Sequence, residues 1–258
     1  IINVVGAKIW GGGEQYVYDI CKQLQQRHRT AYILVDQSNE DMQSRYAKVG
    51  HVMTANLYTL KGFLSVNAVA KQMKEQGINT IVCHSGKYIL FCIALKQLTG
   101  AKLVFIKHNL VPGKTDIYHR WINAQVDAFV CVSKLVYDDL MTPAIKDTSK
   151  YHVVYNGIDP NRFQSFSDAV SMKSKVRTFG YSARITERKG LYLILNALEQ
   201  IHQNNLDVRL IISGAGTEDQ IKKLKDYIHA HKMHSYVEFI GFTRDIEGLY
   251  LSLIHISE

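Results

Sequence analysis

The feature that most constrains the fold is a regular alternation of short apolar segments with amphipathic helical patterns along almost all of the 258 residues. The apolar segments are rich in Val, Ile, Leu, Phe and Tyr, which is typical of strands buried on both faces. Between most of them, apolar residues recur at the i, i+3, i+4 and i+7 spacing of one helix face. This alternation predicts an α/β fold with parallel sheets.

The predicted strands are Ile2–Val5, Ala31–Val35, Thr80–Cys83, Leu103–Ile106, Ala128–Val132, Val153–Tyr155, Thr178–Ser182, Val208–Ser213 and Val237–Ile240. The predicted helices cover approximately residues 14 to 27, 63 to 76, 86 to 98, 115 to 124, 133 to 141, 190 to 204 and 218 to 231.

A polar segment without clear periodicity, Gln164 to Lys175, interrupts this alternation, and a strand–loop–helix pattern begins again after it. Such a segment is typical of a linker between domains. We therefore expect a Rossmann-like domain over residues 1–160, a linker over 161–176 and a second Rossmann-like domain over 177–258.

Charge and cysteine content limit the cellular setting. Residues 1–150 carry 18 Lys and Arg against 11 Asp and Glu, so most of the net charge of +8 lies in the first half. Such an excess suits anionic lipid, nucleic acid or a phosphorylated substrate, and it is also compatible with ordinary solvated surface. The most continuous apolar run, Tyr88 to Leu95, is too short to span a bilayer. The four cysteines form no C-x-x-C pair and mostly follow apolar patterns, so we expect reduced thiols and a cytoplasmic location.

Three consecutive glycines, Gly11 to Gly13, lie between the first predicted strand and the first predicted helix. Glycine supplies tight-turn dihedral angles, and it also exposes the backbone N–H groups of a helix N-terminus to a phosphate or carboxylate. The spacing is not the G-x-G-x-x-G dinucleotide pattern. The loop alone does not decide between turn geometry and anion binding.

A second candidate anion site precedes the helix that begins near Gly190. Arg184, Arg188 and Lys189 crowd its N-terminus, where the helix dipole disfavours positive charge. A bound diphosphate would remove this conflict. Gly214, Gly216 and Gly241 follow later strands, where an open α/β sheet presents its ligand face, although each glycine also fits an ordinary turn.

Together these motifs resemble the retaining family-4 glycosyltransferases of the GT-B fold. The motifs that carry the resemblance occur in the family's order and are GGGE, VDAFVCVS, YHVVYNGIDPNRF, GYSARITERKG, LIISGAG and VEFIGFTRDIEGLY. The resemblance implies two Rossmann-like domains with parallel sheets, the second incomplete, with donor binding mainly by the second domain and transfer in the cleft between them.

The resemblance also implies roles for individual residues. Arg184 and Lys189 would hold the donor diphosphate and stabilise the departing nucleoside diphosphate, with Arg184 preceded by Ala183 where the family usually has Gly. Gly214 and Gly216 would border the nucleoside, and Gly12 and Gly13 would approach the phosphates from the first domain. His108, which follows a predicted strand, matches a histidine that contacts the sugar or assists the reacting centre, so His108, Arg184 and Lys189 are the predicted catalytic residues. Gly241 joins the predicted substrate-binding residues, and His84 is interpreted as structural.

No Asp-x-Asp pair occurs in the sequence, so we expect no metal and no other cofactor, with cationic side chains and helix termini in their place. The family continues after Tyr250 into a segment that holds the donor's sugar and ribose. Here the chain ends as LSLIHISE, which is similar to a translated sequencing adaptor. We therefore expect residues 251–258 to be non-native, and the isolated fragment to be inactive.

The function implied by the resemblance is transfer of a hexosyl group, with retention, from a nucleotide-sugar to a saccharide or lipid-linked acceptor in cell-envelope polysaccharide or glycolipid synthesis. A nucleotide-sugar epimerase of the same fold and an inactive nucleotide-binding fragment are the alternatives. No nucleic acid partner is expected. Two basic and apolar segments suggest peripheral contact with an anionic membrane on its inner face, namely Lys61 to Lys74 and Lys114 to Trp121. The alternative for residues 63 to 73 is packing on the sheet.

Overall fold

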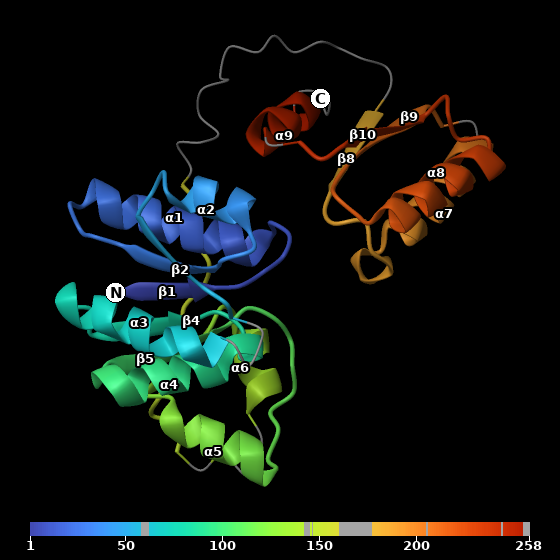
Figure 1. Cartoon of the computed structure of the whole chain (residues 1–258). Coiled ribbons are helices and arrows are strands. Elements are labelled where there is room, and N and C mark those ends of the chain that lie inside the picture. Colours follow the sequence, from blue (N-terminus) through green and yellow to red (C-terminus); the bar gives the residue numbers. More distant parts are fainter. Residues whose placement is uncertain are drawn as a thin grey trace. The chain divides into compact units, whose positions relative to one another are not determined.

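The computed structural model describes residues 1–57, 62–141, 145, 147–159, 177–204, 206–243 and 245–254. The chain divides into two compact units, Ile1–Gly157 and Ile158–Glu258, and each unit is described by itself (Figure 1). The predicted linker over 161–176 lies outside the described residues.

A seven-stranded sheet forms the centre of the first unit, and every neighbouring pair of strands is parallel. The strand order is β3-β2-β1-β4-β5-β6-β7. The strands are β1 Ile2–Val5, β2 Tyr32–Asp36, β3 His51–Ala55, β4 Thr80–Cys83, β5 Lys102–Lys107, β6 Ala128–Cys131 and β7 Tyr151–Val153. The predicted parallel α/β architecture is confirmed.

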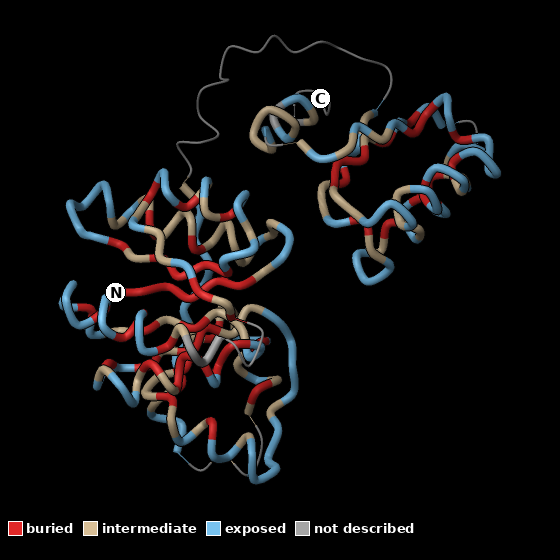
Figure 2. Tube along the Cα trace, viewed as in Figure 1, coloured by how far each residue is buried: buried red, intermediate tan, exposed pale blue. Residues whose placement is uncertain are grey.

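Helices cover the two faces of this sheet because alternate strand residues are apolar on both sides. On one face, α1 (Gly12–Gln26) and α2 (Glu40–Tyr46) pack on a core that includes Val5, Ile33 and Val35. The other face carries the larger core, which Figure 2 shows as buried strands enclosed by more exposed helices. The helices that contribute to it are α3 (Gly62–Glu75), α4 (Ile89–Thr99, after the 3₁₀ turn Gly86–Tyr88), α5 (Ile117–Gln125) and α6 (Lys134–Leu140).

The strand order places a topological switch point between β1 and β4. The chain moves outward from β1 through β2 to β3 and then returns to the other side of β1. In open parallel sheets the carboxyl ends of the strands at such a point form a crevice, because the connections on either side diverge. The loops after β1 and β4 border this position.

From the sequence, α2 and β3 of the first unit were not predicted, and the last strand was placed two residues too late. Asn39 caps α2 by accepting a hydrogen bond from Met42 N, but only Met42 and Tyr46 of the seven helix residues are buried. The edge strand β3 is mostly half-exposed and lacks a continuous apolar run. The last strand begins at Tyr151, two residues before the predicted start.

Packing of α3 corrects one part of the predicted membrane segment. Val66, Val69 and Ala70 are each at most 4% exposed and belong to the core, so this part of the helix packs on the sheet. Lys71 and Lys74 are exposed. Lys61 and the side chains of residues 62–64 lie outside the described part of the chain.

The second unit contains a three-stranded parallel sheet with the order β10-β9-β8. Its strands are β8 Arg177–Ser182, β9 Val208–Ser213 and β10 Val237–Gly241, and its helices are α7 Leu191–Gln203, α8 Glu218–Ala230 and α9 Ile246–Ile254. Leu191, Leu195 and Leu198 of α7 pack into its core, as the helical spacing predicts, whereas Ile194 is 39% exposed. The unpredicted α9 packs against β8, with Leu253 next to Gly180.

No helix in the described ranges combines the length and the apolar character needed to cross a membrane.

Candidate functional site

The glycine loop after β1 leads directly into α1. Gly12 is the first residue of the helix, and Gly11 before it has extended backbone and provides no side-chain cap. A Cβ atom added to Gly12 or Gly13 would meet no described atom within 4 Å. Packing within the unit therefore does not require glycine at these two positions. The first N–H groups of α1 are left without a side-chain cap, which is the arrangement that binds anions at helix N-termini.

His108 directly follows β5, at the same edge of the sheet as the glycine loop. Its half-buried ring lies edge-on to Tyr16, with 5.1 Å between the ring centroids. Tyr16 belongs to α1 and lies one turn after Gly12. The structure thus brings His108 close to the start of α1, together with the predicted residues Gly12 and Gly13. Burial lowers the pKa of His108 and favours the neutral imidazole.

His84 is the functional candidate that the sequence analysis did not find, because it interpreted this residue as structural. Its Nδ1 lies 3.0 Å from Nε2 of His108, and its Nε2 lies 3.1 Å from Oδ1 of Asn3. Burial, followed by the charge of His108, lowers the pKa of His84 to about 3. The sequence signal that could have revealed the pair is their position, since each histidine directly follows one of two neighbouring parallel strands.

In the second unit, the loops that follow the three strands are joined by hydrogen bonds. Ala183 N donates to Ser213 O at 3.1 Å, and Ile185 N donates to Ala215 O at 2.9 Å. Gly214 N donates to Gly241 O at 2.9 Å. These bonds hold the loops before Arg184, around Gly214 and Gly216, and at Gly241 together at the carboxyl edge of the sheet.

The glycines of these loops have structural reasons of their own. A Cβ on Gly214 would lie 1.9 Å from Ala183 O, and one on Gly216 would lie 3.1 Å from Cβ of Ile185. Gly241 adopts a φ of 74°, in the left-handed region that other residues enter with strain. Close loop packing and backbone geometry therefore explain these glycines without any ligand, in contrast to Gly12 and Gly13.

The predicted cations Arg184, Arg188 and Lys189 are all exposed. Arg188 and Lys189 lie in the 3₁₀ turn Glu187–Lys189, which Gly190 joins to α7 with a φ of 71°. Within the described part of the chain, none of the three forms a salt bridge. Three exposed cations therefore lie just before the N-terminus of an apolar helix, where the helix dipole opposes them.

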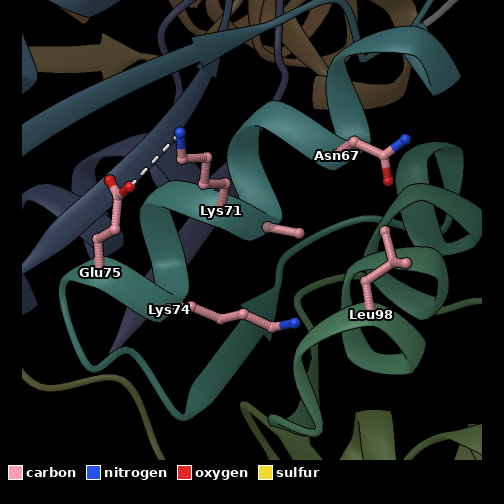
Figure 3. Close-up of a pocket in the computed structure, with 6 residues that line it drawn as sticks. Asn67, Lys71, Lys74, Glu75 and Leu98 are labelled. Atoms are coloured by element: carbon pink, nitrogen blue, oxygen red, sulfur yellow. Dashed lines mark ion pairs between the residues drawn. The ribbon is translucent and has the colours of Figure 1, made fainter.

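Two further features lie away from these loops. An open hollow of about 300 Å³ lies on α3 beside Leu98 of α4, and Figure 3 shows that Lys71 turns towards Glu75, with which it forms an ion pair at 3.9 Å. The residues that line it lie mainly in the C-terminal halves of both helices. In a β–α–β unit these halves lie near the amino ends of the strands, at the opposite edge of the sheet from the glycine loop and His108. Among the described residues, no group of three or more His, Cys, Asp or Glu side chains is arranged to hold a metal ion.

Comparison with solved structures finds the same fold at low sequence identity. A glycosyltransferase from Rickettsia africae has a TM-score of 0.81 and 18% identity, over 97% of this chain and 70% of that chain. HepE from Anabaena, in complex with UDP and glucose, has a TM-score of 0.76 and 20% identity, over 97% of this chain and 71% of that one. Sucrose-phosphate synthase from Thermosynechococcus elongatus has a TM-score of 0.73 and 15% identity, over 99% of this chain and 73% of that one. The predicted GT-B type of α/β fold is confirmed.

Comparison with protein families is consistent with this fold. No curated protein sequence matches the chain. The model of the family described as glycosyl transferases group 1 matches residues 163–256. The model of Glycosyltransferase Family 4 matches residues 10–162, more than half of the chain. Because this match covers more than half of the chain, the chain belongs to glycosyltransferase family 4.

Proposed function

We propose that this protein transfers a hexosyl group from a nucleotide-sugar donor to a saccharide or lipid-linked acceptor, with retention of anomeric configuration. The reaction would belong to the synthesis of cell-envelope polysaccharide or glycolipid, on the cytoplasmic side of the membrane. Family membership supports transferase chemistry, and the similar Anabaena protein has been solved with UDP-glucose.

The observation that carries this proposal is the group of exposed cations before α7, none of which forms a salt bridge to a described residue. When a nucleotide-sugar loses its sugar, negative charge develops on the departing diphosphate, and fixed cations stabilise that charge. Arg184 offers a planar fork for two phosphate oxygens, and Lys189 offers a mobile point charge. These side chains would supply the charge stabilisation without a metal ion or another cofactor.

Residues that follow strands in both units would contact the remaining parts of the donor. The uncapped N–H groups at Gly12 and Gly13 suit a phosphate oxygen, because an added Cβ would meet open space there. Burial lowers the pKa of the half-buried His108 and favours its neutral ring, which is suited to hydrogen bonding with a sugar hydroxyl group. Gly214, Gly216 and Gly241 would border the nucleotide through the backbone of their loops.

Peripheral contact with an anionic membrane is part of the proposal, with α5 and its preceding loop as the contact surface. Ile117, Tyr118 and Trp121 are 87%, 47% and 48% exposed. Lys114 and Arg120 are exposed in the same segment. Exposed apolar and aromatic side chains with neighbouring cations are the composition of interfacial segments.

A donor screen tests the proposed reaction. Residues 1–258 and the natural polypeptide in which residues 1–250 occur are incubated with UDP-, GDP- and ADP-sugars, and nucleotide release is measured with and without saccharide acceptors. We expect acceptor-dependent release by the natural polypeptide, a product whose anomeric configuration matches the donor by NMR, and no turnover by residues 1–258 alone.

The same assay separates the alternatives. Interconversion of the nucleotide-sugar without acceptor would support an epimerase instead. Nucleotide binding by the natural polypeptide without any turnover would support a nucleotide-binding protein and contradict the proposal.

A further inference from the structure

Asn3, His84 and His108 form a diagonal row across three neighbouring strands. Asn3 of β1 pairs with Val82 of β4, and His84 lies two residues beyond Val82. Cys83 pairs with Phe105 of β5, which sets His84 beside Ile106, two residues before His108. A shift of two residues preserves the face of the sheet, so all three side chains project on the side that α1 covers.

The hydrogen bonds along this row fix the position of each proton. The amide of Asn3, which is 3% exposed, donates from Nδ2 to Sγ of Cys21 at 3.7 Å, so its Oδ1 is directed to His84. An amide oxygen only accepts, so Nε2 of His84 carries the proton and Nδ1 of the neutral ring accepts one. Nε2 of His108 is then the donor across the 3.0 Å contact.

This proton arrangement determines the state of Nδ1, the other ring nitrogen of His108. Because a neutral imidazole has one proton, Nδ1 of His108 presents a lone pair. This atom forms no hydrogen bond to any described residue of the chain. The ring is also held in place from α1 by Tyr16, whose centroid lies 5.1 Å from it.

We propose that His84 and Asn3 are positioning residues that hold His108 in the tautomer protonated at Nε2, leaving Nδ1 as an acceptor for a hydroxyl group of the bound sugar. The role of that acceptor rests on the proposed function, whereas the tautomer itself does not. Burial of both rings keeps them neutral near neutral pH, as the hydrogen-bond order requires.

The tautomer is tested by NMR on residues 1–258 with ¹⁵N-labelled histidine and no ligand. Two-bond correlations distinguish protonated from unprotonated ring nitrogens, and His108→Asn identifies the signals of His108 by their loss. We expect a protonated Nε2 and an unprotonated Nδ1 in the unmodified protein. A proton on Nδ1 would mean that Asn3 and His84 are oriented in the opposite sense, and would overturn the proposal.

Three variants test whether the row imposes this tautomer. His84→Phe keeps a ring without an acceptor and should produce a mixture of tautomers, whereas His84→Asn keeps an oxygen near the position of Nδ1 and should restore the Nε2–H form. Asn3→Leu releases His84 and gives a second route to the mixture if His84→Phe fails to fold. An unchanged tautomer in both His84→Phe and Asn3→Leu would contradict the positioning role.

Activity provides an independent readout in the natural polypeptide. His84→Phe should lower kcat about tenfold, the loss typical of removing a partner that orients a functional histidine, with the KM for the donor changed less than about twofold. His51→Phe is the matched control, because His51 stacks on Tyr32 at the edge of the sheet. Absence of any transfer by the unmodified protein would contradict the proposed function but not the tautomer, and a kcat unaffected by His84→Phe would contradict the positioning role alone.

Discussion

Arg184 and Lys189 approach the start of α7 without a paired carboxylate among the described residues, so each can be removed without leaving a buried partner uncompensated. If they neutralise a departing diphosphate, Arg184→Ala and Lys189→Ala should each lower donor turnover about a hundredfold. Nucleoside diphosphate affinity should also fall, and the remaining binding should weaken less with added salt. Turnover is measured in the natural polypeptide, and binding of UDP, GDP and ADP is measured by calorimetry.

A matched control for these variants is Lys222→Ala, since Lys222 on α8 is exposed and unpaired within the described ranges. This substitution removes one positive charge, as the other two do, but it lies inside α8 and not in a loop that follows a strand. Turnover equal to the unmodified protein in Arg184→Ala and Lys189→Ala, or an equal loss in Lys222→Ala, would contradict the diphosphate assignment.

His84 also makes the stability of the first unit depend on pH. Burial and the charge of His108 lower the pKa of His84 to about 3, from an ordinary value of about 6.5. Between these values the unfolded chain binds a proton that the folded chain does not, so the free energy of unfolding falls as the pH falls. One such proton contributes a slope of at most about 1.4 kcal/mol per pH unit. Nearby titratable groups are His108, Tyr16 and, through Asn3, Cys21.

Denaturation experiments measure this slope. Both tryptophans, Trp10 and Trp121, lie in the first unit, so their fluorescence follows its unfolding. Between about pH 4 and about pH 7, His84→Asn should show a flatter dependence of the unfolding free energy on pH than the unmodified protein. Parallel curves for the two proteins would show that His84 titrates normally.

At the scale of elements, periodicity predicts what is long and apolar and misses what is short or half-exposed. The strand–helix alternation predicts the central strands and α1, α3, α4 and α7, because their buried faces repeat with a clear period. It misses α2, which has two buried residues in seven, although it predicts α6, which has the same number in the same length. It misses β3 because an edge strand needs one buried side only.

Residues that directly follow a predicted strand could be placed at the candidate site from the sequence. Contacts that depend on the register between two strands could not. His108 and the glycine loop are adjacent to predicted strands, so their common edge follows from parallel topology. The contact between His84 and His108 depends on how β4 and β5 are offset, and one residue of slip would reverse the side chains. The assignments of His108, Arg184, Lys189 and the five glycines to substrate stay predictions.

The two glycine loops give opposite results on substitution with alanine. Gly13 lies in the first turn of α1 with open space around its Cβ position, so Gly13→Ala should raise the stability of the first unit by up to about 1 kcal/mol. The added methyl group should nevertheless weaken nucleoside diphosphate binding about tenfold, because it intrudes where a phosphate would approach. Gly214→Ala should destabilise the second unit, since its Cβ would meet Ala183 O at 1.9 Å.

Tryptophan fluorescence and circular dichroism together separate these effects. Gly13→Ala should shift the fluorescence transition upwards, whereas Gly214→Ala should leave it in place and lower the remaining transition seen by circular dichroism. Undiminished nucleotide binding by a stably folded Gly13→Ala would remove this loop from the donor site.

At the scale of the whole molecule, nearly all of the net positive charge lies in the first unit. The excess of Lys and Arg lies in residues 1–150, whereas residues 151–258 are close to neutral, with 13 Lys and Arg against 12 Asp and Glu. Near a negative membrane surface each cation contributes roughly 1 kcal/mol, within a distance limited by salt screening. The first unit is therefore the part that an anionic bilayer would attract, and α5 supplies exposed apolar side chains on its surface.

Sedimentation with lipid vesicles tests this orientation of the molecule towards a membrane. Residues 1–258 should bind vesicles of phosphatidylglycerol and phosphatidylcholine, lose most of that binding at high salt, and show little affinity for phosphatidylcholine alone. Trp121→Ser and Ile117→Ser should each weaken binding several-fold, because each removes exposed apolar surface that would enter the interface. Leu193→Ser is the control, since Leu193 is 74% exposed on α7 of the near-neutral second unit and should have no effect. Binding that is insensitive to salt, or equally weakened by Leu193→Ser, would contradict an electrostatic contact between the first unit and an anionic membrane.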